Sequence, residues 1–96
     1  MADGDLRTVR VRIEGRVQGV GYRYWVEQTA GALALSGWVR NHRDGSVEAV
    51  FSGVPGKVGQ MIALCRKGPR SAAVSSVDVK EEAQLPAPGF ATWPTA

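Results

Sequence analysis

The sequence predicts an α+β fold in which two helices pack on one face of an antiparallel sheet of four to five strands. Two observations predict it. Several short stretches alternate apolar with polar residues, which is the period of a strand with one buried face. Two longer stretches repeat apolar residues at helical spacing. The order strand, helix, strand, strand, helix, strand is a split β-α-β arrangement.

The first strand is predicted for residues 8–14, where Val9, Val11 and Ile13 alternate with charged residues. A helix follows from residue 22 to residue 34 or 35. Its apolar positions recur at helical spacing and are Trp25, Val26, Thr29, Ala30 and Leu33. Gly37 is expected to cap the C-terminal end of this helix.

A β-hairpin is predicted next, with strands at residues 38–41 and 46–51. Asp44 and Gly45 between them are a strong signal for a hairpin turn. Because crossovers in such units are right-handed, we expect the first and second strands to be parallel, with the third strand between them. Asn41 should then lie near the start of the first helix, along one side of the sheet.

A second helix is predicted to begin at Pro55 and to end at Gly68. Its apolar stripe should face the sheet and consists of Val54, Val58, Met61, Ile62 and Cys65. Val77 and Val79 then alternate with charged residues in a fourth strand, and residues 90–93 suggest a short last strand. Two helices on one face of this sheet make the expected domain ferredoxin-like.

The chain has 96 residues, which is enough for one domain with one core but too few for two. We expect residues 1–7 to form a flexible leader and residues 8–96 to form a single domain. The N-terminus is acidic and polar rather than signal-like, and no apolar run is long enough to cross a membrane. We therefore expect a cytoplasmic protein, and we expect it to be a monomer.

The net charge of +3 suits a small anionic substrate, and also weak nonspecific attraction to nucleic acid. The sequence has no basic run and no aromatic RNA-binding signature, which argues against a nucleic-acid partner. Cys65 and His42 are the only cysteine and the only histidine. An internal disulfide is therefore excluded, and we expect no metal and no cofactor.

Residues 15–23 connect the first strand to the first helix and read Gly-Arg-Val-Gln-Gly-Val-Gly-Tyr-Arg. Such a loop places backbone N–H groups at the positive end of a helix dipole, which makes it a ready anion site. Its glycines lack a Cβ and let the backbone approach a ligand closely. Arg23 offers a planar fork of donors to the same anion. These residues alone fit a plain strand-to-helix connection with a solvated arginine equally well.

The loop resembles the first signature of the acylphosphatase family, Gly-x-Val-Gln-Gly-Val-x-Phe/Tyr-Arg, at every fixed position. Residues 37–53 resemble the second signature of that family, which contains Asn41 and closes at Gly53. Two signatures in the right order on the expected elements are a specific signal, and the resemblance spans residues 7–82. Residues 83–96 depart from it, since family members often end in an aromatic-arginine-tyrosine-like strand.

The resemblance implies a metal-free enzyme that hydrolyses the carboxyl–phosphate bond of small acyl phosphates. It implies that Arg23 binds the phosphoryl oxygens and that Asn41 orients the attacking water, whose proton passes to the substrate's own phosphate. The further phosphate-binding residues that it implies are Arg16, Val17, Gln18, Gly19, Val20, Gly21 and Tyr22. Considered by itself, Asn41 is more typical of a residue that stabilises a turn.

The sequence argues against the chemistry of a cysteine phosphatase. A cysteine phosphatase needs an arginine six places after its cysteine, but Ser71 stands there. Cys65 lies on the apolar stripe of the second helix, which is typical of a buried structural thiol. His42 is expected to be a solvated turn residue. Arg16 and Arg40 either raise the positive potential of the site or are plain surface charges.

The alternative to an enzyme is a non-catalytic module that binds an anion or nucleic acid, because ferredoxin-like sheets serve both purposes. A binding module needs the cradle of N–H groups but has no use for a water-holding Asn41 beside Arg23. The pairing of these two residues therefore favours the enzyme, and we expect it to be free-standing.

Overall fold

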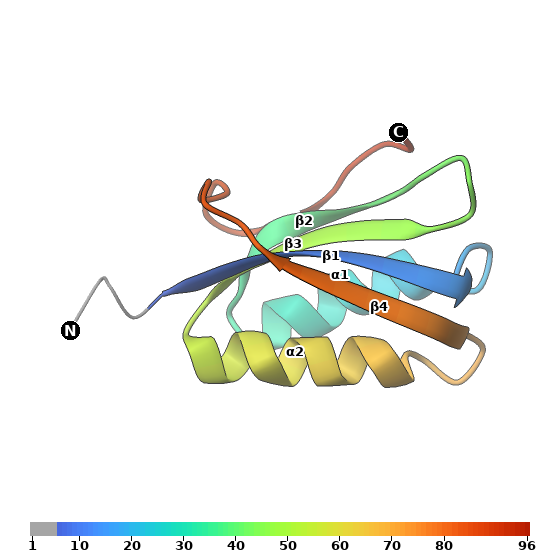
Figure 1. Cartoon of the computed structure of the whole chain (residues 1–96), viewed down its shortest axis with the longest axis horizontal. Coiled ribbons are helices and arrows are strands. Elements are labelled where there is room, and N and C mark those ends of the chain that lie inside the picture. Colours follow the sequence, from blue (N-terminus) through green and yellow to red (C-terminus); the bar gives the residue numbers. More distant parts are fainter. Residues whose placement is uncertain (1–5) are drawn as a thin grey trace.

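The computed structural model describes residues 6–96 as a sheet covered on one face by two helices (Figure 1). In chain order the elements are β1 (Arg7–Arg16), α1 (Tyr22–Ala32), β2 (Ser36–Asn41), β3 (Val47–Gly53), α2 (Pro55–Lys67), β4 (Ala73–Glu81) and β5 (Phe90–Thr92). The expected leader of residues 1–7 falls mainly on residues 1–5, which lie outside the described residues. Neither helix of the described chain is long and apolar enough to cross a membrane.

The strands lie in the order β4-β1-β3-β2-β5. β3 lies between β1 and β2 and is antiparallel to both, which confirms the predicted split β-α-β topology. The expectation of an antiparallel sheet needs one correction, because β5 pairs with β2 in the parallel direction. Residues 82–89 turn the chain back after β4 and carry it to the opposite edge, so β5 runs in the direction of β2.

The hydrophobic core lies between the sheet and the two helices. Val26 and Ala30 of α1 and Val58, Met61 and Cys65 of α2 are completely buried against alternate residues of the strands. This is the packing that the helical and strand periods predict. Burial raises the pKa of the Cys65 thiol to about 12, because a thiolate would be poorly solvated there. Cys65 is thus a structural thiol, as its place in the sequence predicts.

Three expectations about helix ends need correction. α1 ends at Ala32, because Ala34 adopts a left-handed conformation with φ of 57°. Gly37 does not cap the helix but lies in β2, where an added Cβ would stand 1.8 Å from the carbonyl oxygen of Val50. Val54 is 61% exposed instead of facing the sheet, because it precedes the first turn of α2 as its N-cap.

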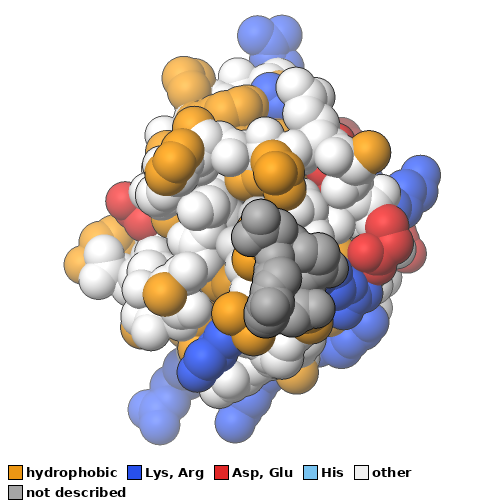
Figure 2. All heavy atoms as spheres, turned by 90° about the vertical axis from the view of Figure 1, so that its left-hand side faces the viewer, with side chains coloured by type: hydrophobic (Ala, Val, Ile, Leu, Met, Phe, Trp, Pro, Cys, Tyr) orange, Lys and Arg blue, Asp and Glu red, His pale blue; other side chains and the backbone are white. Residues whose placement is uncertain are grey.

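The β1–α1 loop and the β2–β3 hairpin lie at the same end of the molecule, on the right in Figure 1. Figure 2 shows the opposite end, where hydrophobic side chains form several small groups and lysines and arginines lie toward the margin. The β1–α1 loop and the β2–β3 hairpin, which carry the two sequence signatures, thus lie together at the end of the molecule that Figure 2 does not show, as the topology predicts.

Candidate active site

Residues 17–21 join β1 to α1 in a loop whose backbone donors are unused. Gly19 and Gly21 have φ of 73° and 78°, which glycine adopts without strain. Within residues 6–96, no backbone N–H from residue 18 to residue 21 donates to a protein acceptor. Gly21 is the N-cap of α1 and provides no side-chain cap, so the positive end of the helix dipole faces the loop as well. Together these groups have the features of an anion cradle.

Two of the predicted loop residues belong to β1 instead. Gly15 lies at an irregularity in the pairing of β1 with β4, and an added Cβ would stand 2.2 Å from the carbonyl oxygen of Ala73. Glycine is therefore required here by the close approach of two strands and not by a ligand. Arg16 is exposed and pairs with Ala73 as the last residue of β1.

Several loop residues are held in place by packing and hydrogen bonds. Val17 and Tyr22 are each 1% exposed, and the Tyr22 hydroxyl donates to the carbonyl oxygen of Cys65 at 2.8 Å. Burial raises the pKa of the Tyr22 phenol well above its usual range. The carbonyl oxygen of Val20 accepts a hydrogen bond from the Ser71 hydroxyl at 2.8 Å. The buried side chains of Val17 and Tyr22 thus anchor the two ends of the loop in the core.

Gln18 fastens the loop to the β2–β3 hairpin. Its Nε2 donates to the carbonyl oxygens of His42 and Ser46, at 2.7 and 2.8 Å. The Gln18 side chain therefore fixes the distance between the loop and the end of β2, where Asn41 lies. Its side-chain amide nitrogen is thus engaged by the hairpin, whereas its backbone N–H donates to no described residue.

The loop, the first turn of α1 and the end of β2 enclose a hollow of about 210 Å³. The residues that line it are Val17, Gln18, Gly19, Gly21, Tyr22, Arg23, Tyr24 and Asn41. Arg23 is half-buried and makes no ion pair with any described residue. The buried Oδ1 of Asn41 accepts no hydrogen bond from the described chain. The hollow thus brings together the two predicted catalytic residues, whereas Arg16 and Val20 are not part of its lining.

Tyr24 is the lining residue that sequence reasoning missed. It follows Arg23 in the first turn of α1 and is 68% exposed. The sequence carried a signal for Tyr24, which stands outside the apolar stripe of α1 and directly after Arg23, the residue predicted to bind the anion.

Arg40 and His42 lie on the opposite face of the sheet from Asn41, because side chains alternate along β2 and its continuation. Arg40 Nε donates to Glu48 Oε1 at 2.9 Å, and His42 Nε2 lies 2.6 Å from the same oxygen. Burial alone would raise the pKa of Glu48, but hydrogen bonds from His42, Arg40 and Arg10 lower it to about 2. The expectation that His42 is a solvated turn residue is therefore wrong, and Arg40 is a paired charge outside the hollow.

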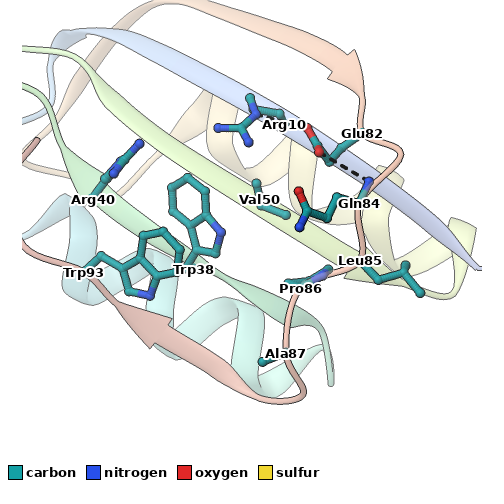
Figure 3. Close-up of a pocket in the computed structure, with 10 residues that line it drawn as sticks. All are labelled: Arg10, Trp38, Arg40, Val50, Glu82, Gln84, Leu85, Pro86, Ala87 and Trp93. Carbon is teal, nitrogen blue, oxygen red and sulfur yellow. Dashed lines mark hydrogen bonds and ion pairs between the residues drawn. The ribbon is translucent and has the colours of Figure 1, made fainter.

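A second hollow, of about 350 Å³, lies on this open face beside residues 82–87 (Figure 3). The Trp38 and Trp93 rings stack there with centroids 4.2 Å apart, and the Arg40 guanidinium lies over both rings. Arg10 is paired with Glu82 at 3.1 Å. Because carboxylates accept hydrogen bonds from both arginines, this hollow lacks the unpaired cation that distinguishes the one at the β1–α1 loop.

No group of three or more histidine, cysteine, aspartate or glutamate residues in the described chain is placed to hold a metal ion. The charge in the first hollow comes from Arg23 and from the backbone N–H groups around it.

The family model and the similar proteins that match this chain agree on one family. The family model described as Acylphosphatase matches residues 9–92. The chain is 64% identical over 69 residues to an acylphosphatase of Bradyrhizobium diazoefficiens, covering 72% of this chain and 70% of that protein. It is 48% identical over 90 residues to an acylphosphatase of Rhodospirillum rubrum, covering 94% of this chain and 99% of that protein.

Solved structures agree with the sequence comparisons. An acylphosphatase from Coxiella burnetii superimposes with a TM-score of 0.91 at 32% identity, over 97% of this chain and all of that one. A full-length HypF structure matches with a TM-score of 0.84 at 22% identity, over 94% of this chain and 12% of its own length. At this level of identity, the similarity to HypF shows a shared fold only.

Proposed function

The chain belongs to the acylphosphatase family, and from this premise we propose that Arg23 and the β1–α1 loop bind the phosphoryl group while Asn41 orients the attacking water. The enzyme hydrolyses acyl phosphates to a carboxylate and inorganic phosphate, as members of this family do. The proposal concerns which residues perform that reaction.

Phosphoryl binding is assigned to donors that the protein itself does not use. The guanidinium of Arg23 offers a planar fork, which suits two oxygens of one phosphoryl group. The N–H groups of residues 18–21 and the positive end of α1 add donors around the same hollow. The loop and helix backbone donors are in place before the substrate arrives, so they and Arg23 can stabilise the charge that spreads over the phosphoryl oxygens during the reaction.

The observation that carries the proposal is the side chain of Asn41, which belongs to the lining of the same hollow as Arg23 and whose buried Oδ1 has no hydrogen-bond donor among the described residues. A buried acceptor without a partner costs about 1–3 kcal/mol, so its retention calls for an explanation. A water molecule that donates to this oxygen removes the cost. The same water is then held beside the phosphoryl group that Arg23 fixes.

The reaction needs no covalent intermediate. A lone pair of the water oxygen forms the new P–O bond while the bond between phosphorus and the acyl oxygen breaks. Its electron pair leaves with the carboxylate, which is already a good leaving group. The proton of the water passes to a phosphoryl oxygen, so the products are a carboxylate and dihydrogen phosphate. The protein contributes position and charge, which are the two main sources of catalysis in phosphoryl transfer.

The test is Asn41→Ala, assayed by phosphate release from benzoyl phosphate and by binding of inorganic phosphate. If Asn41 orients the water, kcat falls by at least about 100-fold while phosphate affinity stays within about twofold of the wild type. Gln84→Ala, on the exposed segment at the open face, is the matched control. A variant that unfolds at a lower temperature but retains its kcat would show instead that Asn41 only stabilises the turn.

A further inference from the structure

Tyr24 differs from the other exposed apolar residues in its position. The large apolar side chains that are exposed in the described chain are Leu6, Tyr24, Val54, Leu85 and Trp93. Among them only Tyr24 lines the hollow that contains Arg23 and Asn41. It is 68% exposed and makes no side-chain hydrogen bond or ring contact with another described residue. An apolar ring is therefore presented to solvent at the mouth of the active site.

The direction of the reaction places the acyl group away from Asn41. In phosphoryl transfer the attacking and leaving oxygens lie roughly in line on opposite sides of phosphorus. With the water held by Asn41 at the end of β2, the carboxylate departs on the opposite side of the phosphoryl group. Tyr24 comes from a different element, the first turn of α1, directly after the residue that holds the phosphoryl oxygens.

The size of the hollow also places the acyl group outside it. Its volume of about 210 Å³ is below the range of about 300–1,000 Å³ that is usual for pockets enclosing a small organic ligand. A phosphoryl group and one water fit, and the acyl group projects into the mouth. Gly19 and Gly21 leave open space there, since an added Cβ would meet no atom within 4 Å at either position. Bulk in the acyl group is thus tolerated.

We propose that Tyr24 is the contact for the acyl group, and that the enzyme favours acyl phosphates with a flat, apolar and uncharged acyl group, such as an aromatic one, over small aliphatic ones. This inference rests on the proposed function. A planar acyl group stacks on the exposed ring of Tyr24 and removes apolar surface of both from water. Among the described residues, Arg23 is the one charged residue in the lining and is occupied by the phosphoryl group under the proposed function, so this lining offers no further cation for a second negative charge on the substrate.

The experiment compares kcat/KM for benzoyl phosphate and acetyl phosphate in the wild type, Tyr24→Ala and Tyr24→Phe. Removing one good aromatic contact should lower kcat/KM for benzoyl phosphate by about 5–20-fold in Tyr24→Ala. The value for acetyl phosphate should change by less than about twofold, because its methyl group gains little from the ring. Tyr24→Phe keeps the ring and should retain the wild-type preference. Leu85→Ala, which removes another exposed apolar side chain far from the hollow, is the matched control.

Inhibition by the carboxylate products is a second measurement, because it reports binding of the acyl group separately from the rate at which each acyl phosphate is hydrolysed. Benzoate should inhibit the wild type more strongly than acetate does, and Tyr24→Ala should remove most of that difference. Wild-type kcat/KM for both substrates in Tyr24→Ala overturns the inference, as does an equal loss of kcat/KM on both, which would place Tyr24 at the phosphoryl group. If the wild type releases phosphate from neither substrate, the proposed function itself fails.

Discussion

Replacing Gln18 with alanine should weaken both the fold and the active site, because its side chain joins the loop to the β2–β3 hairpin. Two hydrogen bonds are lost, each with a net contribution of about 0.5–1.5 kcal/mol. The carbonyl oxygens of His42 and Ser46 each keep one backbone donor, from Gly45 and from His42, so neither is left without a partner. We therefore expect a loss of about 1–2 kcal/mol in the free energy of unfolding, at the lower part of the possible range.

In a domain of this size, each kcal/mol lowers Tm by about 4–8 °C, so the melting curve should show the change clearly. The loop should also move relative to Asn41, and kcat/KM for benzoyl phosphate should fall by at least about tenfold, since small misplacements of bound groups are costly. Urea unfolding and phosphate release measure the two effects. Gln60→Ala, on the exposed side of α2, is the control. Wild-type stability together with wild-type kcat/KM in Gln18→Ala would refute the assigned role of the Gln18 side chain.

Two further predictions concern charge. Arg23→Gln should lower kcat/KM by at least about 100-fold and abolish competition by inorganic phosphate, whereas Arg43→Gln, which removes an exposed charge in the neighbouring turn, should do neither. Inhibition by phosphate that persists unchanged in Arg23→Gln would place the anion site elsewhere. Glu48→Gln should unfold more easily than the wild type at neutral pH, and the difference should shrink as pH falls from about 4.5 toward 2. The folded-state pKa of Glu48 is lowered to about 2 from 4.5, so its stabilising effect is present above that window and is lost within it. Urea unfolding of both proteins at several pH values measures this, and a constant difference would contradict it.

Local sequence patterns predicted the order of the elements because that order depends on short-range periods, whereas the two candidate segments of the site were indicated by their resemblance to the family signatures. Val9, Val11 and Ile13 face the core because a strand alternates its side chains, and this holds whatever the strand pairs with. The loop glycines at 19 and 21 were identified for the same reason, since a left-handed turn is a local property.

Features that depend on distant pairing were missed or misassigned. The sequence analysis assigned Gly15 to a loop and Gly37 to a helix cap. Each glycine is instead needed because a neighbouring strand, distant in the sequence, passes too close to leave room for a Cβ. The parallel edge strand depends on the path of residues 82–89 across the end of the sheet, which has no local signal. The pairing of His42 with Glu48 depends on the register of β2 against β3. None of these three features can be predicted from the sequence of a single helix or strand.

The alternation of side chains along β2 also bears on how a chain with a modest net charge of +3 could bind an anion at the proposed site. Arg40 and His42 point to the open face, where Glu48 accepts hydrogen bonds from both and from Arg10. Asn41, between them in sequence, points to the opposite face and brings a neutral amide to the hollow instead of a charge. No carboxylate of residues 6–96 lines that hollow, so none of these side chains neutralises the positive charge of Arg23 there. Among the described residues, the paired Arg10 and Arg40 thus lie on the open face and the unpaired Arg23 lies on the helix side, where under the proposed function a substrate phosphate binds without competition from a carboxylate of the lining.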